Sequence, residues 1–132
     1  MSDDEQFDSE FLALTEQLLG SIANADWDRY TELCADDLTC FEPESLGHQV
    51  EGMTFHHFYF ELGGHMPASQ SSIVAPRVRR LGSDAALVTY TRLVQTTDSE
   101  GRTSTHAFEE TRVWQRVNDA WKHVHFHRST SG

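Results

Sequence analysis

The sequence has few features that are typical of a disulfide-stabilised, secreted or membrane protein. Its only two cysteines, Cys34 and Cys40, lie close together. Two thiols in a chain without a secretion signal favour reduced core residues over a disulfide framework. No apolar run approaches the roughly 20 residues of a membrane helix, and the start, Met1-Ser2-Asp3, is acidic where a secretory signal is basic. We therefore expect a soluble, cytoplasmic protein.

Basic residues are also scarce. The chain has 10 Lys and Arg against 21 Asp and Glu, which gives a formal net charge of -11 at pH 7. Such a surface repels the phosphates of nucleic acids and the headgroups of anionic membranes. We therefore predict neither nucleic acid nor a membrane as a partner.

Motifs of nucleophilic and nucleotide-dependent enzymes are missing. The sequence has no Gly-x-Ser-x-Gly elbow, no Gly-x-Gly-x-x-Gly loop and no phosphate-binding loop with its lysine. One acid–base pair stays open as an alternative, His56 with Glu110, because an imidazole and a carboxylate together could abstract a proton. We predict a non-catalytic protein without a cofactor.

The histidines offer no complete set of metal ligands. His123, His125 and His127 alternate along one segment, so a regular strand would place all three on the same face. Two such histidines can share a zinc ion, but no cysteine in the pattern adds a further ligand. We predict that these histidines are structural and that the chain has no metal site.

The chain is long enough for one domain and too short for two separate cores. It has 132 residues, of which 38% are hydrophobic, so it can bury a real core. We expect residues 1–6 to form an acidic disordered tail and residues 7–132 to form a single domain.

The hydrophobic period changes from helical in the first half to alternating in the second. Helical spacing predicts helices at about 7–22 and 53–62, the latter ended by Gly63-Gly64, and a short helix capped by Asp26 that includes Cys34. Strands are predicted at 38–41, 73–80, 85–96, 104–117 and 121–128, and the last four are separated by short turns. We therefore predict an α+β fold, with helices packed on one face of a curved antiparallel sheet.

Three arginines fall on the apolar face of the predicted sheet. Alternation along the strands places Arg92, Arg112 and Arg128 with bulky apolar side chains. Arginine is costly to bury without an anion, because its charge cannot be titrated away. Internal carboxylates could pair with the arginines, with Glu110 nearest and able to neutralise one of them at best. The other interpretation is a cationic cavity that holds an external carboxylate, from a small molecule or an acidic peptide.

Five segments carry a resemblance to a known family. They are LTEQLL (14–19), LTCFEPESLG (38–47), VEGMTFHHFYF (50–60), EETRVW (109–114) and WKHVHFHRS (121–129). In this order, from about residue 11 to residue 130, they resemble the association (hub) domain of calcium/calmodulin-dependent protein kinase II. The resemblance implies a nuclear transport factor 2-like cone, whose dimers close into a ring that gathers kinase subunits. It also implies a cavity for carboxylates, walled by His56, Arg92, Arg112 and Arg128.

The resemblance leaves some questions open. Neither a kinase domain nor a calmodulin-binding segment precedes the hub-like region, and the start at Met1-Ser2 favours a stand-alone hub over a piece of a kinase. The stretch 62–72 is shorter than the corresponding loop of the family and lacks its lysines, which leaves the size of the ring open. Expected partners are further copies of the chain, a kinase chain or acidic peptide, and small carboxylates. The alternative is a small-molecule-binding or isomerase- or dehydratase-like enzyme with the same fold.

Overall fold

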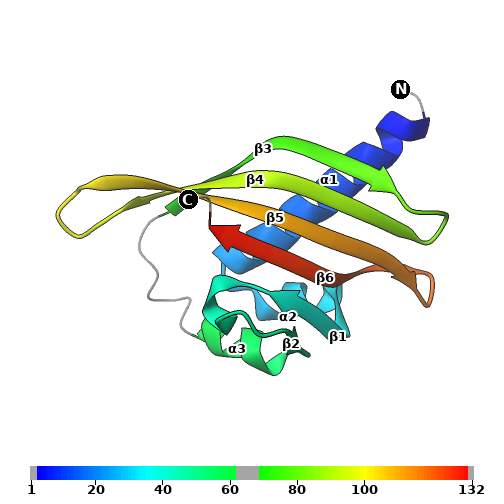
Figure 1. Cartoon of the computed structure of the whole chain (residues 1–132), viewed down its shortest axis with the longest axis horizontal. Coiled ribbons are helices and arrows are strands. Elements are labelled where there is room, and N and C mark those ends of the chain that lie inside the picture. Colours follow the sequence, from blue (N-terminus) through cyan, green and yellow to red (C-terminus); the bar gives the residue numbers. More distant parts are fainter. Residues whose placement is uncertain (1–2, 62–68, 131–132) are drawn as a thin grey trace.

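A curved six-stranded sheet with a long helix against it forms the frame of the protein (Figure 1). The computed structural model describes residues 3–61 and 69–130. The helices are α1 (Asp3–Ala23), α2 (Trp27–Leu33) and α3 (Thr54–Glu61), with a 3-10 turn, η1, at Pro43–Ser45. The strands are β1 (Cys34–Phe41), β2 (Val50–Glu51), β3 (Ser69–Arg80), β4 (Ala85–Thr97), β5 (Thr103–Val117) and β6 (Ala120–Thr130). The predicted α+β architecture is therefore confirmed.

The order of the strands in the sheet is β2-β1-β6-β5-β4-β3. Strands β3 to β6 form the predicted antiparallel meander. Strand β1 lies beside β6 and runs parallel to it, so the first strand of the chain pairs with the last of the described strands. Helix α1 crosses the sheet behind β3–β5, whereas α2 and α3 lie near β1 (Figure 1).

Helix α1 begins earlier than the periodicity predicts. It starts at Asp3, so residues 3–6 are helical and the disordered tail that we expected there is wrong. Asp3, Asp4 and Glu5 occupy the first turn, where the positive end of the helix dipole stabilises acidic side chains.

None of the helices in the described ranges is long and apolar enough to cross a membrane.

The short second helix ends earlier than expected. Asp26 caps it as predicted, because its side chain accepts a hydrogen bond from the Arg29 backbone N–H at 3.2 Å. The prediction placed Cys34 in this helix and began the next strand at residue 38, but Cys34 already belongs to β1 and pairs with His123 of β6. Helix α3 lies within its predicted range, and its expected stop at Gly63-Gly64 lies outside the described residues.

An irregularity in β6 corrects the expected arrangement of its histidines. Val113 pairs with His125 but its neighbour Trp114 pairs with His123, so Val124 is an extra residue in a β-bulge. His123 is therefore fully buried, whereas the His127 side chain is exposed. The prediction that the three histidines share one face is wrong, because regular alternation does not continue through a bulge.

The core lies between the inner face of the sheet and the helices. Its largest fully buried side chain is that of Trp114, whose indole N–H donates a hydrogen bond to the Thr15 hydroxyl of α1 at 3.3 Å. Phe11 and Leu18 of α1 and Leu38 of β1 are also fully buried. One contiguous cluster thus joins α1 to both halves of the sheet.

Replacing Leu38 by alanine should test the contribution of this core. Leu38 is 0% exposed, so we expect Leu38→Ala to lower the free energy of unfolding by about 2–5 kcal/mol. The control Val117→Ala changes a side chain that is 36% exposed and should stay within about 0.5 kcal/mol of the wild type. Urea denaturation at one fixed protein concentration measures both, and equal effects of the two substitutions would contradict this assignment of the core.

Candidate functional site

The register of the sheet brings the predicted arginines into neighbouring rows on its inner face. Tyr90 of β4 pairs with Glu110 of β5, and Glu110 pairs with Arg128 of β6. Arg112 lies two residues beyond Glu110 on the same strand, and therefore on the same face. Arg92 lies two residues beyond Tyr90, on the other side of this row.

Glu110 binds two of the arginines. One of its carboxylate oxygens accepts hydrogen bonds from Arg112 at 2.9 Å and from the Tyr90 hydroxyl at 2.6 Å. The other oxygen lies 3.0 Å from Nε of Arg92. Glu110 therefore contacts two arginines, because its two oxygens face opposite neighbours, and its single negative charge is shared between them.

The guanidinium group of Arg112 contacts side chains of three neighbouring strands. Its Nε donates to the Tyr90 hydroxyl at 2.8 Å, and its Nη1 lies 3.3 Å from Nε2 of His123. Burial alone would raise the pKa of Glu110, but the charges of Arg112 and Arg92 and the hydrogen bond from Tyr90 outweigh it and lower this pKa. Glu110 and Arg112 therefore form a charged, buried pair.

The contact between Arg92 and Glu110 differs from the one between Arg112 and Glu110. Nε of Arg92 and Oε2 of Glu110 are close enough for an ion pair, yet their directions do not form a hydrogen bond. Both atoms are shielded from solvent and have no hydrogen-bond partner within the described ranges. A small polar group could therefore satisfy both of them.

Arg128 extends the cluster toward the turn that follows β1. It forms a close ion pair with Glu44 of η1, and a longer contact of 3.9 Å with Glu42. The guanidinium carbons of Arg128 and Arg92 lie 4.9 and 5.6 Å from the centre of the Phe108 ring. Arg92 and Arg128 thus gather around one aromatic ring. Burial, and then the positive charges of Arg112 and Arg128, lower the pKa of Arg92 against the opposing effect of Glu110.

His56 lies beyond the arginines, on the inner side of α3. Its ring centre is 5.7 Å from that of Phe126, and Phe126 in turn lies under the guanidinium group of Arg112 at 4.7 Å. Burial, and then the charge of Arg112, lower the pKa of His56 to about 4, so the ring is neutral at pH 7. Within residues 3–61 and 69–130, His56 is bonded neither to an arginine nor to Glu110. The structure does not assemble the alternative acid–base pair.

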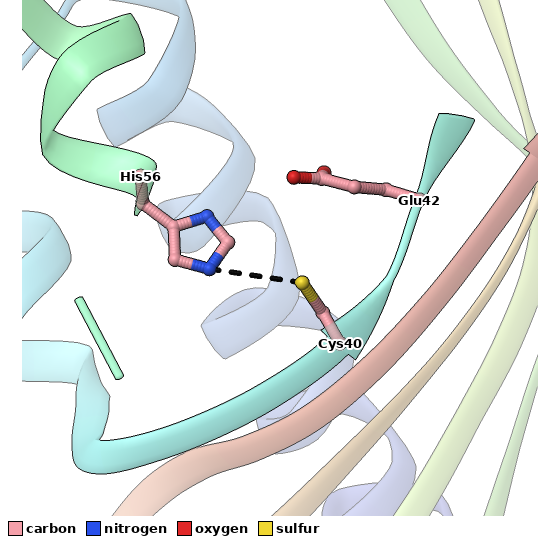
Figure 2. A group of neighbouring side chains, drawn as sticks. All are labelled: Cys40, Glu42 and His56. Atoms are coloured by element: carbon pink, nitrogen blue, oxygen red, sulfur yellow. Dashed lines mark hydrogen bonds between the residues drawn. The ribbon is translucent and has the colours of Figure 1, made fainter. Parts of the chain in front are cut away.

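Sequence reasoning missed three residues beside this cluster. Glu42 and Glu44 supply the carboxylates that meet Arg128, and the thiol of Cys40 lies 3.7 Å from Nε2 of His56. Figure 2 shows His56 facing Cys40, near the end of β1, and Glu42, which follows that strand. The Glu-Pro-Glu sequence that follows the strand predicted at 38–41 could have indicated these two carboxylates. A proline after a strand favours a turn, which can bring its neighbours back toward the sheet.

Each of the three arginines already contacts a carboxylate of the chain itself. Two surface hollows lie elsewhere, one lined by Asp8, Leu12 and residues 75–78, the other lined by residues of α1 with Ser71 and Ile73 of β3. Neither is lined by Arg92, Arg112 or Arg128. A ligand at the arginines would therefore have to compete with an internal carboxylate.

Removing the negative charge of Glu110 should strongly destabilise the fold. We expect Glu110→Gln to lower the free energy of unfolding by about 3–5 kcal/mol, because two buried arginines lose their shared anion. The control is Glu100→Gln, because Glu100 pairs with Arg102 on the surface. It should cost about 0–1 kcal/mol. Urea denaturation would contradict the role of Glu110 if both variants matched the wild type.

The same variant should change the pH dependence of stability. The pKa of Glu110 is lowered in the folded protein from its ordinary value of 4.5. Its contribution is therefore fully present above the ordinary pKa and is lost as pH falls through the lowered one. The difference in unfolding free energy between wild type and Glu110→Gln should be constant above pH 4.5 and shrink below it. Denaturation curves over this range measure it, and a constant difference would contradict the shift.

Comparison with known proteins identifies the family. The family model described as the calcium/calmodulin dependent protein kinase II association domain matches residues 8–132. The chain is 48% identical over 124 residues to the calcium/calmodulin-dependent protein kinase type II alpha chain of Drosophila melanogaster. The match covers 92% of the chain but 23% of that relative, so the chain spans about a quarter of its length.

Solved structures agree with this match. The association domain of C. elegans CaMKII superposes with a TM-score of 0.87 and 37% sequence identity, covering 96% of this chain and 97% of that one. A nuclear transport factor 2-like superfamily protein from Salmonella enterica superposes with a TM-score of 0.78 and 20% identity, covering 98% and 94%, which shows the shared fold. The chain belongs to the association-domain family of calcium/calmodulin-dependent protein kinase II.

Proposed function

We propose that the protein is a non-catalytic hub whose dimers close into a ring and gather kinase chains in the cytoplasm. The observation that carries the proposal is the match of the association-domain family along residues 8–132. Exposed apolar side chains support it: Phe58 and Tyr59 of α3 are 59% and 42% exposed, and Leu46 is 84% exposed. Groups of such side chains are typical of surfaces that meet a partner. A repeated interface that closes into a ring avoids open filaments.

Assembly predicts a particle larger than a dimer. The chain has a mass of 15.0 kDa, so light scattering coupled to size-exclusion chromatography should give a mass well above twice this value at micromolar concentrations. A mass of one or two chains throughout that range would contradict the hub function.

We further propose that Arg92, Arg112 and Arg128, with Glu110 and His56, form a pocket for a carboxylate from a small molecule or an acidic peptide. Arg92 and Arg128 are the groups that would contact it, because their side chains are 13% and 15% exposed, whereas that of Arg112 is 3% exposed. The unsatisfied Nε of Arg92 supports this assignment. Glu44, whose side chain is 37% exposed, would move away as the ligand carboxylate takes its place on Arg128.

Calorimetric titration with acetate tests the pocket. We expect the wild type to bind and Arg92→Met to lose binding, because a charge-assisted donor is removed. Arg79→Met is the matched control, because Arg79 also lies on the sheet but is exposed to solvent. Equal binding by Arg92→Met and wild type, or no binding by either, would mean that the arginines serve only internal ion pairs.

Competition by Glu44 gives a second test of the pocket. Glu44→Gln removes the anion that occupies Arg128, so acetate should bind this variant more tightly than the wild type. An unchanged or weaker affinity would contradict the exchange of Glu44 for the ligand.

A further inference from the structure

A separate cluster of potential metal ligands lies beside the arginines. Cys40 lies near the end of β1, and Glu42 follows the strand directly with an extended backbone, so the two side chains, two residues apart, extend to the same side. His56 reaches them from α3 (Figure 2). One ligand atom of each residue, the Cys40 sulfur, a Glu42 carboxylate oxygen and an imidazole nitrogen of His56, lies within 4.8 Å of the other two.

The spacing of these atoms fits a tetrahedral ion. Zinc binds a thiolate sulfur at about 2.3 Å and an imidazole nitrogen at about 2.0–2.1 Å, so at the tetrahedral angle the two ligands lie roughly 3.6 Å apart. The Cys40 sulfur and Nε2 of His56 lie 3.7 Å apart. The Glu42 carboxylate would need to approach by a small rotation of its side chain. We propose that Cys40, Glu42 and His56 form a zinc site with an open fourth position.

Burial and charge around the three side chains favour this assignment. Cys40 is fully buried and His56 is 6% exposed, so an ion would be bound in a dry environment where its attraction to thiolate and carboxylate is strong. Glu44 holds the close ion pair with Arg128, whereas Glu42 contacts Arg128 at 3.9 Å. Glu42 is thus the freer carboxylate, and Arg128 can still orient it as an outer partner.

The mixed donor set selects the class of metal. Magnesium and calcium prefer oxygen ligands alone, whereas sulfur together with imidazole nitrogen suits zinc. Burial raises the pKa of the Cys40 thiol to about 12, so the free thiol is protonated and unreactive until an ion replaces its proton. The predicted absence of a metal site rested on the histidines of β6, and the present site uses none of them.

A second buried cysteine provides an internal comparison. Cys34 lies 3.6 Å from Nδ1 of His123, nearly the same spacing as in the proposed site. No carboxylate completes that pair among the described residues, and the guanidinium group of Arg112 lies 3.3 Å from the other nitrogen of His123. Arg112 thus contacts this pair directly, whereas it acts on Cys40 and His56 only through its charge. Cys34 is therefore a matched control for Cys40.

Cobalt(II) titration followed by absorption spectroscopy tests the site. We expect wild type and Cys34→Ser to bind one cobalt ion per chain with a thiolate-to-cobalt charge-transfer band, which zinc then removes by displacement. Cys40→Ser should lose this band, and Glu42→Gln should weaken binding by at least the 10–100-fold that is typical for loss of an outer partner. The test does not depend on assembly or on carboxylate binding.

Other outcomes would overturn the proposal. These are no cobalt binding by the wild type, a spectrum without the thiolate band, as exposed histidines such as His127 would give, or a band that survives in Cys40→Ser. Thermal unfolding supplies an independent measurement, because an ion that binds only the folded state raises the melting temperature. Zinc should raise it for wild type and Cys34→Ser but not for Cys40→Ser, and an equal rise in all three would also overturn the site.

Discussion

The buried charge of Arg112 is the constraint on which the rest of the inner sheet depends. A guanidinium group cannot lose its proton at any ordinary pH, so the fold must supply an anion and further acceptors at fixed positions. Glu110 and Tyr90 do so from β5 and β4, and His123 adds a contact from β6. A slip of one residue between these strands would turn the partners to opposite faces. The contacts of Arg112 with Tyr90 and His123, which cross between strands, therefore specify the register of the meander. The ion pair with Glu110, which lies on the same strand as Arg112, offsets the charge.

Local patterns predicted the frame of the protein well. Helical spacing predicted α1 and α3, and alternation placed Arg92, Arg112 and Arg128 on one face. The family resemblance, which the comparisons confirm, came from long matching segments rather than from these periodicities. Such patterns work because each depends on neighbours within a few residues along the chain.

The errors arose where distant parts of the chain meet. The start of β1 at Cys34 depends on pairing with β6, and the inward turn of His123 depends on a bulge opposite Trp114. The partners of Arg128 come from the turn after β1, which reverses the chain toward the sheet. Alternation therefore identified the buried arginines but not the carboxylates of this turn. The Cys40–His56 contact was missed for the same reason, because it links a strand to a helix that follows it across a turn.

The position of β6 between β1 and β5 has a consequence for how the chain matures. Cys34 and His123, whose backbones pair across this junction, are 89 residues apart in sequence. Until β6 is in place, β1 and β5 each present an open edge, and unpaired edges are the usual sites of pairing with other chains. Contacts of such long range also slow folding. A chain emerging from the ribosome thus exposes the edges of β1 and β5 until β6 has been synthesised and inserted between them.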